Sequence, residues 1–223
     1  KEYVYDNFSS VILTSATLTV NKTFNYFAQR CGTDLVPKEK ISYHLLKSSF
    51  DYAKQVKFFV PKGINYKEDK DGHLEKCIEF LEKAVLASEG GSLILCTGHK
   101  QVEVFYNALI GPFSHNNIWL LRQAKGISVS TVIRDFKEDI NSVLIGTETL
   151  WQGIDVPGVS LRSLFIHKVP YRMFRLPVIR ARRDAVEEAG GDGFADYYEP
   201  LATLVLKQGF GRLIRKSTDY GIV

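Results

Sequence analysis

The sequence lacks several features that would assign it at once to a class of protein. It contains no apolar run of about 18 residues and opens on no signal-peptide pattern, so nothing predicts a membrane span or secretion, and we expect a cytoplasmic protein. It has no GxxxxGK[ST] loop to cradle nucleotide phosphates. No Asp-Glu pair follows a predicted strand to hold Mg²⁺. The chain alone is therefore not expected to hydrolyse a nucleotide.

Cysteine and methionine are also scarce. The three cysteines, Cys31, Cys77 and Cys96, lie far apart and form no CxxC pair, and we identify no histidine at ligand spacing. We interpret them as reduced thiols, with neither disulfides nor a metal site. Because the single methionine is Met173, we expect this chain to be a segment of a longer protein. The last residues, 220–223, are typical of a strand that has just begun.

Hydrophobic residues make up 45% of the 223 residues, enough for one large domain or two small ones. The net charge is +4, and the arginines gather after position 161. A basic half fits a polyanionic partner, and a solvated surface explains it equally well. These arginines are Arg162, Arg172, Arg175, Arg180, Arg182, Arg183, Arg212 and Arg215.

Predicted strands alternate with predicted helices along most of the chain. Apolar runs of four to six residues indicate strands buried on both faces, and apolar residues at helical spacing indicate amphipathic helices between them. This alternation predicts an open parallel α/β sheet. The strands are expected at 10–18, 55–60, 92–96, 118–121, 141–146 and 164–169, and the helices at 21–36, 73–87, near 102–109, near 132–136, at 177–189 and from Pro200.

Polar loops follow three of these strands. They are Ser15-Ala16-Thr17, Thr97-Gly98-His99-Lys100 and Gly146-Thr147-Glu148-Thr149. Ligands of open α/β sheets bind beyond the carboxyl ends of the strands, so these loops are the candidate binding residues. The segment 62–72 is polar and charged, and we expect an exposed loop there, ordered or disordered.

Near the end of the chain, Gln208, Arg212 and Arg215 have the i, i+4, i+7 spacing of one helix face. Two guanidinium groups and an amide on one face could clamp phosphates, because arginine offers a planar fork of donors. The alternative is a solvated helix face. Gly209 and Gly211 favour the clamp, since each glycine costs roughly 1 kcal/mol in a helix and needs a reason such as close backbone approach.

A second constellation runs from Gly146 to Gly158, directly after a predicted strand. Its hydroxyls and backbone N–H groups suit nucleic-acid phosphates. Trp151 either stacks on a base or, more simply, packs in the protein. Asp155 either accepts hydrogen bonds from a ribose or caps the following turn.

Three stretches together resemble the DinG-type branch of the XPD-like superfamily 2 DNA helicases. Residues 11–18 resemble helicase motif III, residues 146–158 resemble motif V, and residues 208–215 resemble motif VI; residues 93–109 are similar to motif IV and its helix. The resemblance implies a RecA-like fold, an open and mostly parallel sheet with helices on both faces. It also implies ATP-dependent translocation on single-stranded DNA from 5′ to 3′.

The resemblance further implies roles for individual residues. Arg212 and Arg215 would reach the ATP phosphates, one of them as the arginine finger, and Gln208 would sense the nucleotide. Gly153 and Asp155 would lie on the nucleotide side of motif V. The expected DNA contacts are Thr97, His99, Lys100, Thr147 and Trp151, and the residues expected to couple the ATP and DNA sites are Ser15 and Thr17.

The resemblance places the missing parts of the ATP site elsewhere. Residues 1–19 would be the tail of a first RecA-like domain, whose preceding residues supply the phosphate loop and the Mg²⁺ ligands. Residues 20–223 would be the second RecA-like domain, truncated at its end. Any iron–sulfur cysteines would also lie upstream, so no cluster is expected here. Gln152 stands where the family more often has glutamate.

The rival interpretation is a non-catalytic α/β module that binds nucleic acid or another protein.

Overall fold

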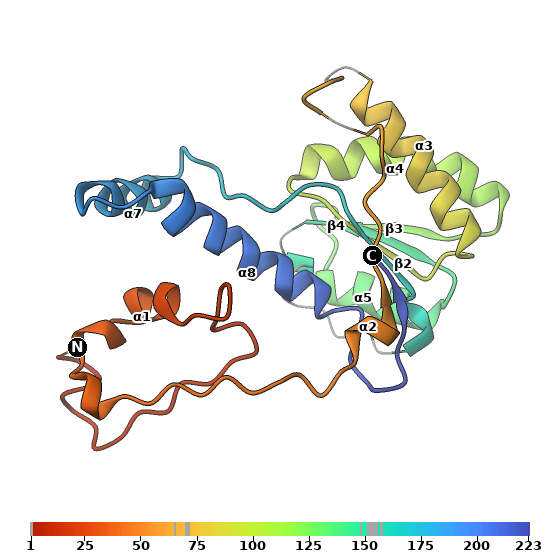
Figure 1. The fold of residues 1–223 in the computed structure, drawn as a ribbon. Helices are drawn as coiled ribbons and strands as arrows, with labels where there is room; N and C mark the ends of the chain where they lie inside the picture. Colours follow the sequence, from red (N-terminus) through yellow and green to blue (C-terminus); the bar gives the residue numbers. More distant parts are fainter. Residues whose placement is uncertain (1, 65, 70–71, 148, 151–155, 157) are drawn as a thin grey trace. The chain divides into compact units, whose positions relative to one another are not determined.

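A computed structural model of the chain describes all residues except 1, 65, 70–71, 148, 151–155 and 157 (Figure 1). Its contacts divide the chain into two compact units. The sheet unit comprises Ser49–Val169 and Gln208–Val223, and the flanking unit comprises Lys1–Ser48 and Pro170–Lys207. In the part of the chain that is described, no helix has the length and apolar character needed to cross a membrane.

The sheet unit is built on one parallel sheet of six strands in the order β1-β6-β5-β2-β4-β3. Leu93 of β2 stands opposite Leu144 of β4 and Leu164 of β5. The predicted parallel α/β sheet is therefore confirmed, including the short last strand. The strands are β1 (Val56–Lys57), β2 (Ser92–Leu95), β3 (Leu120–Arg122), β4 (Val143–Gly146), β5 (Ser163–Ile166) and β6 (Gly221–Ile222).

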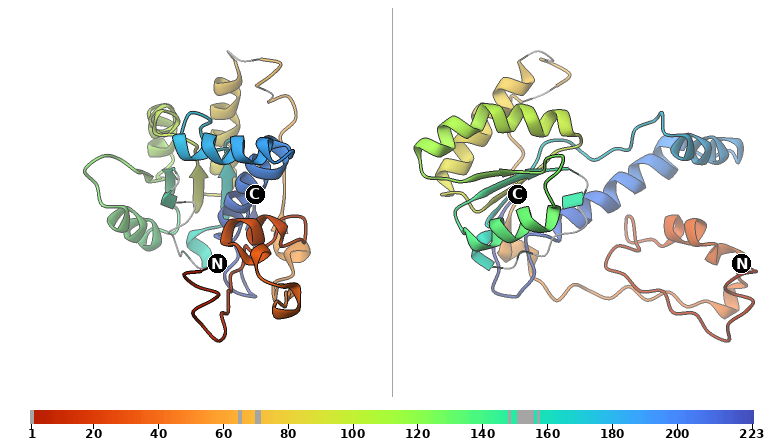
Figure 2. Two further views of the ribbon diagram at one scale, coloured as in Figure 1. Left: turned by 90° about the vertical axis from the view of Figure 1, so that its left-hand side faces the viewer. Right: turned by 180° about the vertical axis from the view of Figure 1, so that it is seen from behind.

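Helices cover both faces of this sheet. The helices α3 (His73–Ala87) and α4 (His99–His115) lie on one face and α5 (Val129–Glu138) lies on the other (Figures 1 and 2). Every residue of β2 and β4 is buried, which explains why these strands are continuous apolar runs rather than alternating ones. The helix predicted at 73–87 has the predicted bounds. Two short elements, α2 (Tyr52–Gln55) and the 3-10 turn η3 (Gly158–Ser160), complete the unit.

The core between the sheet and the α3/α4 layer is apolar and tightly enclosed. Phe105 and Leu109 of α4 are fully buried together with Val85 of α3. Ile94 of β2 and Ile145 of β4 add their side chains to this core. Alternate residues of a strand point to the same face of the sheet, and here that face meets α3 and α4. Cys96 belongs to this core, and burial raises the pKa of its thiol to about 12, so it is no nucleophile.

Arg162 fastens the amino-terminal side of the sheet. Its guanidinium group donates to the carbonyl oxygens of Ser88 and Glu89 after α3, at 3.2 and 3.0 Å. It also donates to the carbonyl oxygens of Val159 and Ile140 and to the Asn141 side chain. One arginine thereby joins the turns that precede β2, β4 and β5. Arg162, one of the clustered arginines noted in the sequence, therefore stabilises the fold.

The flanking unit holds α1 (Asn25–Cys31), α7 (Pro177–Glu188), the π-helix η4 (Gly193–Tyr198) and most of α8 (Glu199–Phe210). The 3-10 turns η1 (Thr33–Leu35) and η2 (Lys38–Lys40) belong to it as well. Its aromatic centre is formed by the buried Tyr197 and Tyr198, with Arg30 stacked 5.3 Å from the ring centroid of Tyr197. The left-handed Gly32 ends α1, so the helix predicted at 21–36 forms only at Asn25–Cys31.

The strand predicted at 10–18 is wrong. Residues 10–15 form no regular element, and Ile12 is 89% exposed. A strand is stable only when a neighbouring strand takes its hydrogen bonds, and the described residues near this segment offer only the single bridge between Val20 and Thr23. The strand predicted at 55–60 is correct only at Val56–Lys57, because α2 occupies the preceding residues.

We predict that Arg162→Met lowers the free energy of unfolding by about 2–3 kcal/mol, since hydrogen bonds from a charged donor are worth about 1.5–3 kcal/mol each and these are partly open to solvent. Urea denaturation followed by circular dichroism measures the change. The matched control is Arg134→Met on α5, whose guanidinium is 63% exposed and pairs only with its neighbour Asp135. The control should change stability by less than about 0.5 kcal/mol. Equal losses for both variants would contradict this role of Arg162.

Candidate functional site

The loops that leave the carboxyl ends of the strands lie side by side at one edge of the sheet. The Cys96 N–H after β2 donates to the Gly146 carbonyl oxygen at 2.8 Å, and the His167 N–H after β5 donates to that of Leu95 at 3.1 Å. The Gln123 N–H after β3 donates to the Ile145 carbonyl oxygen at 2.9 Å. Parallel pairing thus brings four exit loops together, which we call the carboxyl edge.

The exit of β2 presents three of the predicted contact residues. Thr97, His99 and Lys100 are all exposed at the carboxyl edge. Helix α4 begins at His99, and its extended N-cap residue Gly98 has no side chain to bond the first-turn N–H groups. A helix start of this kind carries partial positive charge and free donors, so it attracts anions such as phosphate.

The exit of β4 is fixed by a residue that the sequence reading overlooked. The side-chain oxygen of Gln123 accepts hydrogen bonds from both the N–H and the hydroxyl of Thr147, at 2.9 and 3.0 Å. Thr147 is 6% exposed, so its hydroxyl proton is used inside the protein, whereas Thr149 is exposed. The available signal was a polar residue directly after a predicted strand. Trp151, Gly153 and Asp155, also predicted here, lie outside the described residues.

The predicted helix face of Gln208, Arg212 and Arg215 is wrong. Helix α8 ends at Phe210, and the chain then turns, with the Arg212 N–H donating to the Gly209 carbonyl oxygen at 3.0 Å. Only Gln208 is helical. Glycine is a poor helix former, and the glycine pair at 209 and 211 coincides with the end of the helix. Both arginines are half-buried in the segment after α8.

Two residues that were not predicted hold this segment in place. One oxygen of the buried Asp219 carboxylate accepts from the backbone N–H groups of Arg215 and Lys216, each at 2.8 Å. The side-chain amide of Gln55 donates to the carbonyl oxygens of Lys216, Ser217 and Asp219. The backbone around Arg215 is therefore fixed by Asp219, four residues further along the chain, and by Gln55, 160 residues before it. Only Asp219 is near enough for a local sequence pattern to indicate the contact.

Gln208 carries an unusual polar group. Its side-chain oxygen is buried, and among the described residues it has no hydrogen-bond partner. Buried acceptors are paired in nearly all proteins, so this unpaired one calls for a ligand donor or water. This observation fits the predicted role of Gln208 without testing it.

Ser15 and Thr17, predicted as coupling residues, belong to the flanking unit. Their hydroxyl oxygens lie 3.4 Å apart, and the Thr17 N–H donates to the Ser15 hydroxyl oxygen at 3.2 Å. The pair forms a small local turn in place of the predicted strand end. In the same unit, the Lys207 ammonium donates to the Thr19 carbonyl oxygen at 2.8 Å, so the predicted motif III segment is tied to α8.

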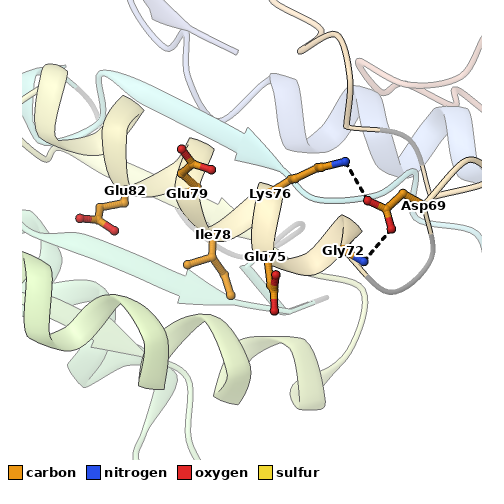
Figure 3. Close-up of a pocket in the computed structure, with 7 residues that line it drawn as sticks. All are labelled: Asp69, Gly72, Glu75, Lys76, Ile78, Glu79 and Glu82. Carbon is orange, nitrogen blue, oxygen red and sulfur yellow. Dashed lines mark hydrogen bonds and ion pairs between the residues drawn. The ribbon is translucent and has the colours of Figure 1, made fainter.

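A surface hollow beside α3 is a poor place for phosphate. It is lined by four carboxylates, with Lys76 as its only cation among the lining residues, and Lys76 is paired with Asp69 at 2.7 Å (Figure 3). The hydrogen bond from Lys76 and that from the Gly72 N–H hold the pKa of Asp69 below its usual value. The remaining carboxylates belong to Glu75, Glu79 and Glu82 on the outer face of α3. The hollow therefore disfavours anions.

Fold and site together define a RecA-like domain, and comparisons with known proteins agree. The helicase C-terminal domain family matches residues 81–223. The ATP-dependent DNA helicase YoaA of Haemophilus influenzae is 34% identical over 216 residues, covering 95% of this chain and 32% of that protein. The ATP-dependent helicase DinG of Mycobacterium tuberculosis is 34% identical over 221 residues, covering 96% of this chain and 32% of that protein.

A solved structure supports the fold independently. The structure of S. tokodaii Xpd4 matches with a TM-score of 0.61 at 15% identity, covering 84% of this chain and 36% of that one. The chain therefore belongs to the helicase C-terminal domain family. It spans about a third of the length of the two helicases described above.

We predict that Gln123→Ala destabilises the fold by about 1–3 kcal/mol, because the N–H and hydroxyl of Thr147 then lose their acceptor in a buried place. Hydrogen exchange read by mass spectrometry should show faster exchange at 146–150. Gln123→Glu is the matched control, since it keeps an acceptor oxygen and should lose less than half as much stability. If both variants behave alike, the interaction with Thr147 does not hold this loop.

Proposed function

We propose that this chain is the C-terminal motor domain of an ATP-dependent DNA helicase that moves 5′ to 3′ along single-stranded DNA. Family membership supports the class, and one structural observation carries the site: the uncapped start of α4 and the fixed exit of β4 lie together at the carboxyl edge. We place the protein in the cytoplasm.

The proposed ATP contacts come from the segment after α8. Arg212 and Arg215 reach the phosphates, one of them as the arginine finger, and the unpaired oxygen of Gln208 meets a donor on the nucleotide side. Gly153 and Asp155 of motif V would lie beside the nucleotide. ATP and Mg²⁺ bind only together with the first RecA-like domain, which supplies the phosphate loop. No iron–sulfur cluster is assigned to this segment.

The proposed DNA contacts lie along the carboxyl edge. Phosphates of the strand meet the α4 start at Thr97, His99 and Lys100, with Trp151 as a further contact, whereas Thr147, predicted as a contact, donates its hydroxyl to Gln123 and positions the loop. Residues 1–19 would be the end of the first RecA-like domain, with Ser15 and Thr17 coupling the two sites, and residues 20–223 the second. The partners are thus single-stranded DNA and the first domain of the same protein.

We predict that Arg215→Ala in the full-length protein reduces DNA-stimulated ATP hydrolysis by a factor of about 10³ or more if Arg215 is the finger, with ATP and DNA binding largely kept. Arg212→Ala tested alongside decides which arginine is nearer the transferred phosphate, because the finger shows the larger loss in kcat. The control Arg134→Ala removes an exposed arginine from α5 and should leave hydrolysis unchanged.

If hydrolysis survives undiminished in both Arg212→Ala and Arg215→Ala, the ATP assignment is wrong. Should single-stranded DNA binding persist in that case, the chain acts as a non-catalytic binding module. A salt titration alone does not separate the two functions, because both release counterions from DNA.

We predict that Asp219→Ala lowers kcat at least about tenfold with a smaller change in KM, because the backbone at Arg215 loses both side-chain hydrogen bonds that fix it. Asp219→Asn keeps an oxygen at the same place and should recover most of the rate. Steady-state ATP hydrolysis of the full-length protein measures both variants. Equal losses for Ala and Asn would show that the carboxylate charge, rather than the hydrogen bonds, matters.

A further inference from the structure

Three metal-binding side chains converge on the inner side of α3, in the sheet unit. His73 and Cys77 lie one turn apart on the helix, and His167 directly follows β5. Their ligand atoms all lie within 4.8 Å of one another. This cluster contradicts the expectation that the cysteines form no metal site. His73 and Cys77 are four residues apart, a spacing that carries little signal alone, and His167 lies 90 residues beyond Cys77.

The spacing of the three groups is close to that of a tetrahedral metal site. Zinc bond lengths of about 2.3 Å to sulfur and about 2.05 Å to nitrogen place a sulfur and a nitrogen ligand roughly 3.6 Å apart and two nitrogens roughly 3.3 Å apart. The Cys77 sulfur lies 3.5 Å from Nε2 of His73. A shift of about 1.5 Å or less would bring the His167 ring into place, since no pair of ligand atoms is more than 4.8 Å apart.

The imidazole nitrogens are left without partners. Nδ1 of His73 and both ring nitrogens of His167 are buried, and none has a hydrogen-bond partner in the described part of the chain. His73 itself is only 9% exposed. Three unpaired ring nitrogens at one place are unexpected for plain packing, because buried polar groups normally find partners. A bound cation would take one of the unpaired nitrogens of His167, with Nε2 of His73, which already contacts the Cys77 sulfur, as its second nitrogen ligand.

Aromatic rings pack against both histidine rings of the cluster. The Phe105 ring meets the His167 ring edge-on at 4.9 Å, and the Tyr66 ring meets that of His73 edge-on at 5.6 Å. The acidic residues of α3 stand on the opposite, solvent-facing side of the helix (Figure 3). The chemistry of the cluster is therefore two imidazoles and one thiol in an apolar setting, which favours zinc and similar borderline-soft ions over Mg²⁺ or Ca²⁺.

We propose that His73, Cys77 and His167 bind a zinc-class divalent cation, with a fourth ligand from solvent. The ion fastens α3 to the end of β5 at the carboxyl edge and serves the fold rather than ATP hydrolysis. This site is independent of the proposed function. The same 3.5 Å contact is equally short enough for a thiol–imidazole hydrogen bond without any metal, and the test separates these two states.

Cobalt(II) is the probe, because a thiolate ligand gives it a sulfur-to-metal charge-transfer absorption band. The full-length protein is stripped with chelator and titrated with Co²⁺. If the site exists, the wild type should bind one more equivalent of Co²⁺ than Cys77→Ser and should show a charge-transfer band that Cys77→Ser lacks. Added Zn²⁺ should displace the extra Co²⁺ and abolish the band. Cys31→Ser, which removes an exposed thiol in the flanking unit, is the matched control and should keep the full signal.

His167→Gln tests the ligand that lies far along the chain. It should weaken Co²⁺ binding at least about tenfold while the circular dichroism spectrum stays unchanged. Zn²⁺ should also raise the melting temperature of the wild type and of Cys31→Ser, since an ion that binds only the folded state stabilises it. If the wild type shows no band and no thermal shift, or if Cys77→Ser retains both, the cluster is a hydrogen-bonded pair and the proposal fails. The wild-type titration decides this even if a variant does not fold.

Discussion

The arrangement of the sheet unit depends on one constraint: the strands β2 and β4 are buried on both faces. Strands of this kind are typical of parallel sheets covered by helices, and they are almost wholly apolar; the buried Ser92 at the start of β2 donates its hydroxyl to the Gly90 carbonyl oxygen. Polar chemistry is therefore restricted to the loops at their ends. Arg162 joins the turns at the amino-terminal ends of β2, β4 and β5 by hydrogen bonds, and the carboxyl edge presents the exposed start of α4.

Two segments with proposed functions are held by hydrogen bonds from outside the predicted motifs: the exit of β4 at the carboxyl edge, and the segment before β6 at the opposite end of the sheet. Gln123 fixes the start of motif V through Thr147, and Asp219 with Gln55 fixes the backbone that carries Arg215. A loop can keep a side chain in place only when its backbone is bonded elsewhere, because glycine-rich turns are otherwise free to move. Residues outside the predicted motifs therefore fix the backbone of both segments.

Much of the fold was predictable from sequence, because apolar periodicity directly reflects burial. The helix at 73–87 and the strands β2 and β4 follow from it. The strand at 10–18 failed because an apolar run does not reveal whether a pairing partner exists. The helix face of Gln208 and the two arginines failed because the glycines end α8 at Phe210. The contacts of Gln55 and of His167 join residues far apart in the sequence, and no local pattern records such contacts.

Hydrogen exchange of the full-length protein, with and without a non-hydrolysable ATP analogue and single-stranded DNA, tests the central claim most directly. DNA should slow exchange at 97–102, where α4 begins, and the nucleotide should slow it at 209–219, where Arg215 is held. The acidic outer face of α3 should be unaffected by either ligand. Protection confined to α3, or no protection at 97–102 with DNA bound, would contradict the assignment of the carboxyl edge as the binding site.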